Sequence, residues 1–385
     1  MSGLRDLEIL DGGGALRVTW DCGLTARFHA LWLRDNAQDA ATRDPGNGQR
    51  LVTLQQIPAA PLIAEAVIAG ACARLRFQPE GKTIDFQSDW LQCHIYDRSP
   101  SRLAPKPAAA VETWDAAMDP ATVTGDYRKL VAERRELRRW LGHVRRYGFA
   151  RLVGGPLEPQ ALLKVAALFG YVRETNYGRW FEVRSEINPS NLAYTGLGLQ
   201  AHTDNPYREP QPTLQILYCL ENAAEGGDSL VVDGFKVAER LYAEDPEGFS
   251  LLAKHRARFE YRGSASVHLT AERPMIEVSA DGEITAVSFN NRSTAPITAV
   301  PFAEMPDYYR AYRRFGELVE DPSMGVTFKL QPGDCFIVDN TRVLHGRQAF
   351  SAAGGTRWLQ GCYPDKDGLL STLSVLEAQA QETAA

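Results

Sequence analysis

The chain has 385 residues, of which 44% are hydrophobic and 23% are charged, the composition of an ordinary soluble globular protein. Its net charge of −6 gives no basic surface for nucleic acid, and acidic residues interrupt the first segment, so we expect neither a signal peptide nor a membrane span. The six cysteines are scattered without a Cys-x-x-Cys pair, which favours free thiols in a reducing cytoplasm over a disulfide framework.

Two domains are expected from the length and from the pattern of the chain. Short β-type runs separated by Gly and Asp turns fill residues 1–98 and predict a small β-rich N-terminal domain. Residues 99–125 have the Pro- and Ala-rich composition of a linker. A larger domain is then predicted over residues 126–385.

Within the larger domain, helical spacing of apolar residues predicts a helix over 126–147 and another over 159–169. The following sequence is mainly β-type, apart from expected helices near 236–242 and 307–318, and no internal repeat is apparent. This order predicts a mainly β fold with flanking helices, in which the larger domain is a double-stranded β-helix, or jelly roll.

The triplet His202-Thr203-Asp204 and the distant His345 predict a metal site. Two imidazoles and one carboxylate on one face of a metal leave the opposite positions open, as a non-haem Fe(II) oxygenase requires. Residues two apart in an extended strand point to the same side, so His202 and Asp204 can bind one ion. We therefore predict that His202, Asp204 and His345 are iron ligands; the alternative is a strand histidine paired with a nearby carboxylate.

Two further residues suit a co-substrate with a carboxylate at each end. Arg357 lies in a strand-like stretch, and its guanidinium can hold a carboxylate with two hydrogen bonds. Ser229 adds a hydroxyl after a Gly-Gly-Asp turn. This set fits 2-oxoglutarate, whose oxoacid end would chelate iron while its far carboxylate pairs with Arg357. Arg347 is the next candidate for the anchor. The competing interpretations are a surface ion pair for Arg357 and a purely structural turn serine for Ser229.

An ordered set of motifs carries a family resemblance over most of the chain. It includes Leu31-Trp32-Leu33-Arg34-Asp35-Asn36, Phe86-Gln87-Ser88-Asp89-Trp90-Leu91, the His202 triplet, Gly226-Gly227-Asp228-Ser229, Ser288-Phe289-Asn290-Asn291 and Leu344-His345-Gly346-Arg347. This set resembles the gamma-butyrobetaine and trimethyllysine hydroxylases of the taurine-dioxygenase-like superfamily. The resemblance implies Fe(II), 2-oxoglutarate and O₂, with ascorbate helpful in vitro. It also implies a homodimer that hydroxylates an aliphatic C–H of a small quaternary ammonium substrate.

The resemblance also implies the residues that bind the substrate. A trimethylammonium group cannot donate hydrogen bonds, so proteins recognise it with the faces of aromatic rings. The family's aromatic cage falls on Tyr177, Phe181, Tyr194 and Tyr363. Its substrate-orienting amides fall on Asn191 and Asn290. The alternative is that the aromatic residues simply fill a β core.

The chain departs from the family pattern in the N-terminal domain. Some members hold zinc there through clustered cysteines and a histidine, but the matching positions are Ala37, Asp39, Thr42 and Lys82. None of these is a zinc ligand of that type, so no zinc is expected. His94 is a lone histidine nearby, for which a structural role is expected.

A second departure concerns the substrate. Arg292 follows Asn290-Asn291, where the butyrobetaine enzymes have a small neutral residue. A guanidinium there would suit 2-(trimethylamino)ethylphosphonate, whose phosphonate carries more charge and more oxygens than a carboxylate. Gamma-butyrobetaine is the alternative substrate if Arg292 points into solvent. Two hypotheses from different classes are a catalytically silent quaternary-ammonium-binding protein and a taurine-type sulfonate oxygenase.

Overall fold

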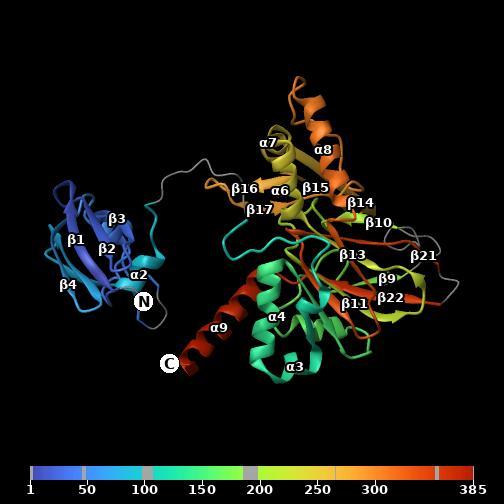
Figure 1. Cartoon of the computed structure of the whole chain (residues 1–385), viewed down its shortest axis with the longest axis horizontal. Helices are drawn as coiled ribbons and strands as arrows, with labels where there is room; N and C mark the ends of the chain where they lie inside the picture. Colours follow the sequence, from blue (N-terminus) through green and yellow to red (C-terminus); the bar gives the residue numbers. More distant parts are fainter. Residues whose placement is uncertain are drawn as a thin grey trace. The chain divides into compact units, whose positions relative to one another are not determined.

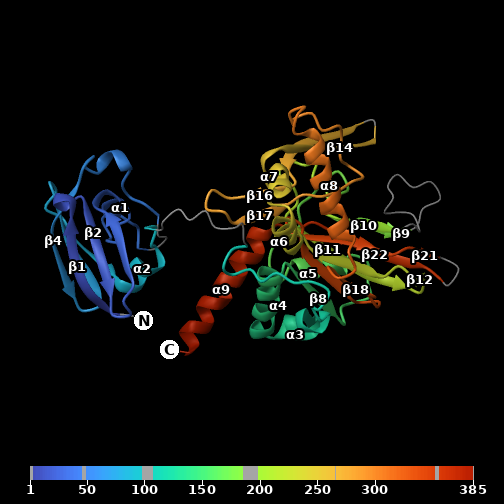
Figure 2. The same cartoon turned by 45° about the horizontal axis from the view of Figure 1, so that its top comes forward.

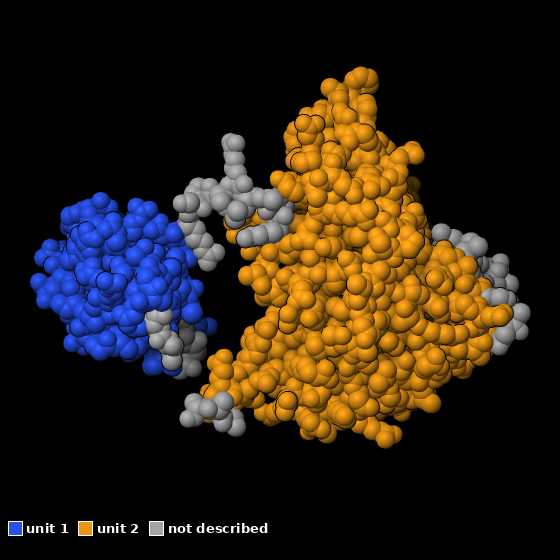
Figure 3. Space-filling model, viewed as in Figure 1, with its two compact units in different colours: residues 1–101 blue, residues 102–385 orange. Residues whose placement is uncertain are grey.

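The computed structural model describes residues 3–45, 49–97, 107–184, 198–264, 266–351 and 355–384. The chain forms two compact units, residues 1–101 and residues 102–385, which are coloured separately in Figure 3. The first unit ends three residues after the predicted boundary at residue 98. The second begins earlier than the predicted residue 126.

The first unit consists of two three-stranded antiparallel sheets with strand orders β1-β2-β3 and β4-β5-β6. Figure 2 labels β1, β2 and β4 of these sheets. In β5, Ala73, Leu75 and Phe77 are buried and the residues between them are exposed, the period of a half-buried strand. The inward faces of both sheets share one core. The strands are β1 (Leu4–Leu10), β2 (Ala15–Trp20), β3 (Thr25–His29), β4 (Leu62–Ala69), β5 (Cys72–Gln78) and β6 (Thr83–Gln87), with short 3-10 helices at Asp11–Gly13 and Leu54–Gln56.

The two halves of this unit share one pattern, although the sequence shows no internal repeat. In each half the third strand runs directly into a short helix, α1 (Ala30–Asp35) after β3 and α2 (Ser88–Cys93) after β6. Each helix packs a tryptophan on the last phenylalanine of its strand, with ring centroids 5.5 Å apart for Phe28–Trp32 and 5.9 Å apart for Phe86–Trp90. Little beyond the spacing Phe-x-x-x-Trp-Leu is common to the two segments, so the repeat is visible in structure rather than in composition.

A polar cluster occupies the positions where no zinc is expected. Lys82 Nζ lies 2.8 Å from Asp39 Oδ2 and 3.1 Å from Thr42 Oγ1, and Thr42 Oγ1 donates to Asp39 Oδ1 at 2.7 Å. Burial would raise the pKa of the Asp39 carboxyl, but hydrogen bonds from Lys82 and Thr42 lower it below its usual value. An ammonium therefore joins two of the three loop positions, while the third, Ala37, is buried. The absence of zinc stays a prediction.

Two sheets form the centre of the second unit. The larger has the order β7-β8-β19-β11-β22-β9 and the smaller β10-β20-β13-β18, and every pair is antiparallel except β7 with β8. Along the chain β10, β11 and β13 alternate between the two sheets, as do β19, β20 and β22. The larger sheet comprises β7 (Thr124–Asp126), β8 (Phe149–Val153), β9 (Phe181–Arg184), β11 (Leu214–Asn222), β19 (Cys335–Asp339) and β22 (Arg357–Cys362). The smaller comprises β10 (Leu199–His202), β13 (Ser229–Asp233), β18 (Gly325–Phe328) and β20 (Val343–Arg347).

This arrangement is mainly β with flanking helices, as predicted, and it is consistent with a jelly roll. Two-stranded ribbons accompany the main sheets. They are β12 (Glu225–Gly226) with β21 (Phe350–Ser351), β14 (Arg256–Ser264) with β15 (Val267–Pro274), and β16 (Ile276–Val278) with β17 (Ile284–Val287). Among the described residues, no helix is long and apolar enough to cross a bilayer.

Six helices described in the second unit form two groups, α3, α4 and α9 in one and α6, α7 and α8 in the other (Figure 1), while α5 packs on β11 and β22. The helix predicted over 126–147 is interrupted at Glu133, whose backbone is extended. The predictions near 159–169, 236–242 and 307–318 correspond to α5, α6 and α8, while the pattern of the sequence did not predict α7 or α9. The bounds are α3 (Tyr127–Ala132), α4 (Arg134–Tyr147), α5 (Ala161–Ala166), α6 (Gly234–Glu244), α7 (Pro246–Lys254), α8 (Met305–Glu320) and α9 (Lys366–Ala384).

Residues 107–125 belong to the second unit, which differs from the predicted linker over 99–125. The segment includes a 3-10 helix at Pro120–Val123 and the start of β7. Trp114 is only 6% exposed; its indole N–H donates to Tyr147 O at 2.6 Å and its backbone N–H to Asp233 Oδ2 at 3.1 Å. Asp233 in turn forms a fully buried ion pair with Arg342 at 2.8 Å. Composition could not indicate these partners, because all of them lie far away in the sequence.

The polar cluster of the first unit gives a testable expectation. Replacing Lys82 by Met should lower the free energy of unfolding of the full chain by about 1 kcal/mol, because Asp39 stays partly buried without its cation. Equilibrium urea unfolding followed by tryptophan fluorescence measures this. In a double-mutant cycle with Asp39→Asn the two losses should be non-additive. Additive losses would show that the pair contributes nothing.

Candidate active site

The three predicted iron ligands come together in the structure. One ligand atom from each of His202, Asp204 and His345 lies within 4.8 Å of the other two. His202 Nε2 is 3.2 Å from Asp204 Oδ1, and His345 Nε2 is 3.8 Å from Asp204 Oδ2. The histidine side chains are only 6% and 7% exposed. Two imidazole nitrogens and a carboxylate converging on one point fit a first-row divalent metal with open positions.

The two histidines are held opposite each other by strand pairing. His202 ends β10 and lies directly across from His345 in β20. Side chains of directly opposed residues project to the same face of a sheet, and here the ring centroids are 4.7 Å apart. The pairing therefore supplies two of the three ligands without any loop.

Asp204 is positioned by a different means from the one expected. The strand ends at His202, so strand alternation does not align the two residues. Instead, the amide of Asn340 accepts from Asp204 N at 2.7 Å and donates to Asp204 O at 2.9 Å. Asn340 is fully buried and also donates to Pro212 O at 2.8 Å, so it fixes the backbone that carries the carboxylate.

The carboxylate of Asp204 also has two side-chain donors. Tyr363 Oη donates to Asp204 Oδ2 at 2.8 Å, and Gln215 Nε2 donates to the same oxygen. Burial would raise the pKa of Asp204, but His202, His345 and Tyr363 together lower it well below the usual range. Asp204 is therefore an anion with a fixed orientation, as a metal ligand requires.

The protonation of the histidines follows from their partners. His202 Nδ1 donates to Gln200 O at 2.7 Å, so the lone pair is on Nε2, and Arg292 Nη2 donates to that nitrogen at 2.7 Å. Burial lowers the pKa of His345 to about 3; the carboxylate of Asp204 opposes this shift and the charge of Arg292 adds to it. Neutral imidazole is the form that binds a metal.

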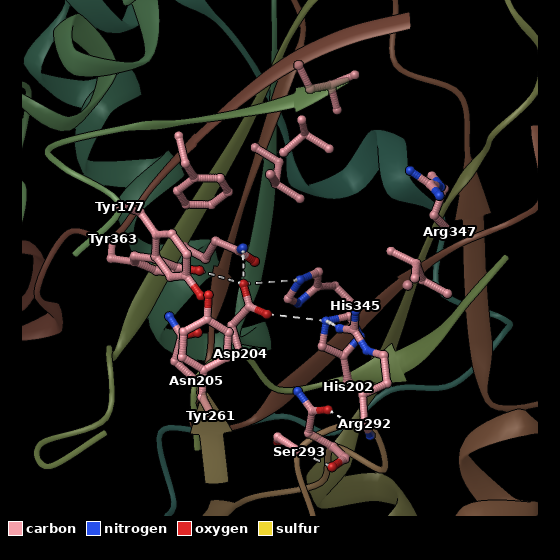
Figure 4. A pocket seen from close by; sticks show the side chains of 18 of the residues that line it. Tyr177, His202, Asp204, Asn205, Tyr261, Arg292, Ser293, His345, Arg347 and Tyr363 are labelled. Carbon is pink, nitrogen blue, oxygen red and sulfur yellow. Dashed lines mark hydrogen bonds and ion pairs between the residues drawn. The ribbon is translucent and has the colours of Figure 1, made fainter. Parts of the chain in front are cut away.

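The triad lies in a cavity of about 300 Å³ (Figure 4). The smaller sheet contributes Ser229 and Arg347 to its lining besides the two histidines, and the larger sheet contributes Phe181, Leu217 and Arg357. The cavity thus opens between the two sheets, with ligands for a metal on one wall and a buried guanidinium on the other.

The basic part of this cavity is built around Phe350. The guanidinium carbons of Arg347 and Arg357 lie 4.7 and 5.5 Å from the centroid of its ring. Arg357 is 8% exposed, and its buried Nε has no hydrogen-bond partner among the described residues. Burial lowers the pKa of Arg357 and, followed by the charges of Arg357 and Arg292, lowers that of Arg347 to about 10. A buried guanidinium with an open donor, such as that of Arg357, fits a carboxylate ligand.

The turn at Gly226-Gly227 brings the backbone close to the side chain of Arg357. Gly227 has φ +73°, and a Cβ there would lie 3.1 Å from Arg357 Nε. Both the backbone conformation and the close approach therefore favour glycine. Ser229 follows and pairs with Arg347 across β13 and β20, so its hydroxyl enters the cavity beside the guanidiniums.

The opposite part of the cavity is aromatic. Ring centroids are 6.1 Å apart for Tyr177–Phe181, 5.2 Å for Phe181–Tyr363 and 6.0 Å for Tyr177–Tyr261. Tyr207 stacks on Tyr261 at 5.0 Å, and the hydroxyls of Tyr177 and Tyr207 are 3.2 Å apart. Figure 4 shows Tyr177, Tyr261 and Tyr363 on one side of Asp204, away from Arg292 and Arg347.

Every predicted site residue that the structure describes lines this cavity. These residues are Tyr177, Phe181, His202, Asp204, Ser229, Asn290, Arg292, His345, Arg357 and Tyr363. Asn191 and Tyr194 lie outside the described residues. Their roles stay predictions, but Tyr363 has a specific contact that the sequence did not indicate: its hydroxyl is bonded to a predicted metal ligand rather than left to the substrate.

Several residues of the cavity are absent from the set predicted from the sequence. Tyr207 lies three residues after Asp204, so its proximity was available in the sequence. Tyr261 and Glu260 come from the β14–β15 hairpin, and Gln215 comes from β11. Asn340, in the turn before β20, does not line the cavity but holds the backbone of Asp204. Nothing local distinguishes these four from ordinary polar or core residues. Only tertiary structure brings them to the site.

A family model described as taurine catabolism dioxygenase TauD, TfdA family matches residues 108–363. The chain belongs to this family. It is 36% identical over 361 residues to the gamma-butyrobetaine dioxygenase of Pseudomonas sp. (strain AK-1), with 94% of this chain and 93% of that protein covered. It is 28% identical over 385 residues to the trimethyllysine dioxygenase of Meyerozyma guilliermondii, with 96% and 95% covered.

Among solved structures, the chain is similar to the non-haem iron oxygenase OrfP in complex with Fe and alpha-ketoglutaric acid. That likeness has a TM-score of 0.44 and 18% identity, and it covers 65% of this chain and 86% of the other. The membership of the TauD/TfdA family and the donor set at His202, Asp204 and His345 confirm the prediction of an iron- and 2-oxoglutarate-dependent dioxygenase.

Tyr363 has two proposed roles, a hydrogen bond to Asp204 and a ring in the aromatic part of the cavity, and one substitution separates them. Replacing it by Phe keeps the ring but removes the hydrogen bond to Asp204, so metal affinity should fall about tenfold or more while substrate affinity changes little. Binding of Mn(II), followed by the electron paramagnetic resonance signal of the free ion, measures the first effect. Tyr177→Phe is the matched control, because its hydroxyl contacts Tyr207 rather than a metal ligand. Unchanged metal affinity in Tyr363→Phe would leave the residue to the aromatic wall alone.

Proposed function

We propose that this dioxygenase hydroxylates an aliphatic C–H of a small trimethylammonium zwitterion, and that 2-(trimethylamino)ethylphosphonate is its preferred substrate. The observation that carries the proposal is the division of one cavity, with aromatic rings on one side of the triad and the guanidinium of Arg292 beside it on the other (Figure 4). A short zwitterion would reach from the aromatic rings to Arg292, with its cation at the rings and its anion at the guanidinium.

The aromatic side suits a quaternary ammonium group. Burial raises the pKa of the Tyr177 and Tyr207 hydroxyls far above the usual value, so both rings are neutral phenols. A trimethylammonium group cannot use donors or acceptors, but it is attracted to the electron-rich faces of such rings. Phe181 contributes a face without any polar atom. Its ring lies against Gly361, where a Cβ would be only 2.3 Å from the nearest ring carbon, so glycine at this position makes room for the ring.

The anionic side favours a phosphonate over a carboxylate. Asn290, one of the two amides predicted to orient the anion, uses its side chain on the backbone: Nδ2 donates to Thr203 O at 3.1 Å and Oδ1 accepts from Arg292 N at 3.2 Å. Its contribution is to hold the loop that carries Arg292. The guanidinium is then the group that meets the anion. It has several donors, and a phosphonate has three acceptor oxygens and up to two charges.

Gamma-butyrobetaine is the second candidate. The relatives named gamma-butyrobetaine dioxygenase, among them the Pseudomonas protein at 36% identity, favour it. Its single carboxylate would need only the two N–H donors along one edge of the Arg292 guanidinium. The choice between the two substrates therefore depends on how much of the binding free energy comes from Arg292.

We further propose the roles of the remaining site residues. His202, Asp204 and His345 would hold Fe(II), which with 2-oxoglutarate and O₂ supplies the oxidising chemistry. Arg357, with Ser229 beside Arg347, would bind the far carboxylate of 2-oxoglutarate. The protein's own contribution is positioning, because a strong oxidant attacks the C–H bond that is presented to it. The cation and anion sites fix that bond.

The proposal is tested by a panel of substrates. Purified enzyme with Fe(II), 2-oxoglutarate and ascorbate should form succinate fastest with 2-(trimethylamino)ethylphosphonate, more slowly with gamma-butyrobetaine and least with trimethyllysine. Sulfite release from taurine would instead support a sulfonate oxygenase. Faster succinate formation with gamma-butyrobetaine than with the phosphonate would reverse the order of the two candidates.

The same assay with variants identifies the cause of the preference. Arg292→Ala should reduce kcat/KM for the phosphonate at least tenfold more than for gamma-butyrobetaine, because it removes the group proposed to bind the anion. Tyr177→Leu is the matched control and should weaken both substrates alike, by about 0.5–2 kcal/mol, since both carry the same cation. Equal losses in Arg292→Ala would remove the reason to prefer the phosphonate.

The anchor for 2-oxoglutarate has its own test. Arg357→Ala should raise the KM for 2-oxoglutarate with a smaller effect on the prime substrate, because a buried carboxylate left unpaired costs about 2–5 kcal/mol. Steady-state kinetics with each substrate varied in turn measures the difference. If the KM for 2-oxoglutarate does not change, the anchor would move to Arg347.

A further inference from the structure

Arg292 contacts the nitrogen of His202 that a metal needs. The lone pair of His202 is on Nε2, because Nδ1 donates its hydrogen to Gln200 O. Arg292 Nη2 donates to this same Nε2 at 2.7 Å, and Figure 4 shows the guanidinium beside the imidazole. One lone pair cannot serve both a guanidinium and a metal ion. Two positive charges at that distance also repel each other strongly. Metal binding and this hydrogen bond are therefore mutually exclusive.

The loop that carries Arg292 is anchored between the metal ligands. Asn290 Nδ2 donates to the carbonyl of Thr203, which separates His202 from Asp204 in the sequence, and Asn290 Oδ1 holds the backbone N–H of Arg292. The base of the side chain is thus fixed beside the triad. The residue as a whole is exposed, so the guanidinium can leave His202 without opening a hole in the core. The backbone of Arg292 is therefore fixed, while its side chain can place the guanidinium in a second position.

We propose that Arg292 caps His202 Nε2 in the metal-free enzyme, and that metal binding moves its guanidinium to the position where it binds the anion of the substrate. The cap follows from the contact alone. The second position rests on the proposed function, because it needs a substrate with an anionic end. Metal binding and substrate binding are then coupled through one side chain, and by linkage each strengthens the other by the same factor.

If Arg292 caps His202 Nε2, its removal should change the metal affinity, which can be measured without substrate or turnover. The full chain, freed of metal by chelation, is titrated with Mn(II) while the electron paramagnetic resonance signal of the free ion is followed. Arg292→Leu should bind Mn(II) about tenfold more tightly than the unchanged chain, because no hydrogen bond has to be broken first. Arg313→Leu is the matched control: it removes the same charge from a position on α8, outside the cavity, and should leave the affinity unchanged.

Salt separates the cap from a long-range effect of removing one positive charge. In about 1 M KCl the Debye length falls to about 3 Å, so repulsion between exposed charges is largely screened whereas a direct contact still has to be broken. The difference between Arg292→Leu and the unchanged chain should persist. Equal or weaker Mn(II) binding by Arg292→Leu would overturn the cap, and so would a difference that disappears in high salt.

The coupling is tested with 2-(trimethylamino)ethylphosphonate as the probe, by calorimetry under argon with and without Mn(II). The unchanged chain should bind the probe at least fivefold more tightly with the metal, and Arg292→Leu should lose this dependence. An equal dependence on Mn(II) in Arg292→Leu would overturn the coupling. Failure of the probe to bind in any state would instead count against the proposed substrate and would leave the titration of the metal to decide the cap.

Discussion

The register between β10 and β20 is the constraint on which the site depends. It sets His202 directly against His345, and a slip of one residue would turn one of the imidazoles to the opposite face of the sheet. β20 is also paired on its other edge with β13, where Arg347 opposes Ser229. The strand therefore cannot slide without breaking pairs on both sides. The larger sheet then has to supply only Arg357 and Phe181 at the separation that sheet packing gives.

Much of the site could be predicted because its chemistry needs particular residue types in a particular order. The His-x-Asp triplet, the distant histidine and the following arginine are such types. The mechanism that aligns them was not predictable in the same way: Asp204 reaches the site through Asn340, far away in the sequence, and not through strand alternation. Tyr261 and Gln215 have no local signal either. Their positions result from the hairpin β14–β15 and from β11 folding over the cavity.

The fold likewise has parts that local sequence patterns predict and parts that depend on contacts with residues far away in the sequence. Periodicity indicated the amphipathic part of α4, whose Trp140, Leu141 and Val144 are buried. Composition misassigned residues 107–125, because a Pro- and Ala-rich stretch can still be held by one buried tryptophan and by backbone groups bonded to Arg342 and Asp233. The cavity also concentrates the charges of Arg292, Arg347 and Arg357. The spacing of these arginines in the sequence does not predict that their positive charges repel one another in one cavity. An anionic ligand would relieve this repulsion.

The two halves of the first unit meet at a pair of tryptophans. Trp32 of α1 and Trp90 of α2 occupy equivalent places in the two halves, and their ring centroids are 5.6 Å apart. Each ring also packs on the phenylalanine of its own strand. The loss of either ring therefore removes packing from both halves at once, so damage to one half cannot stay confined to it.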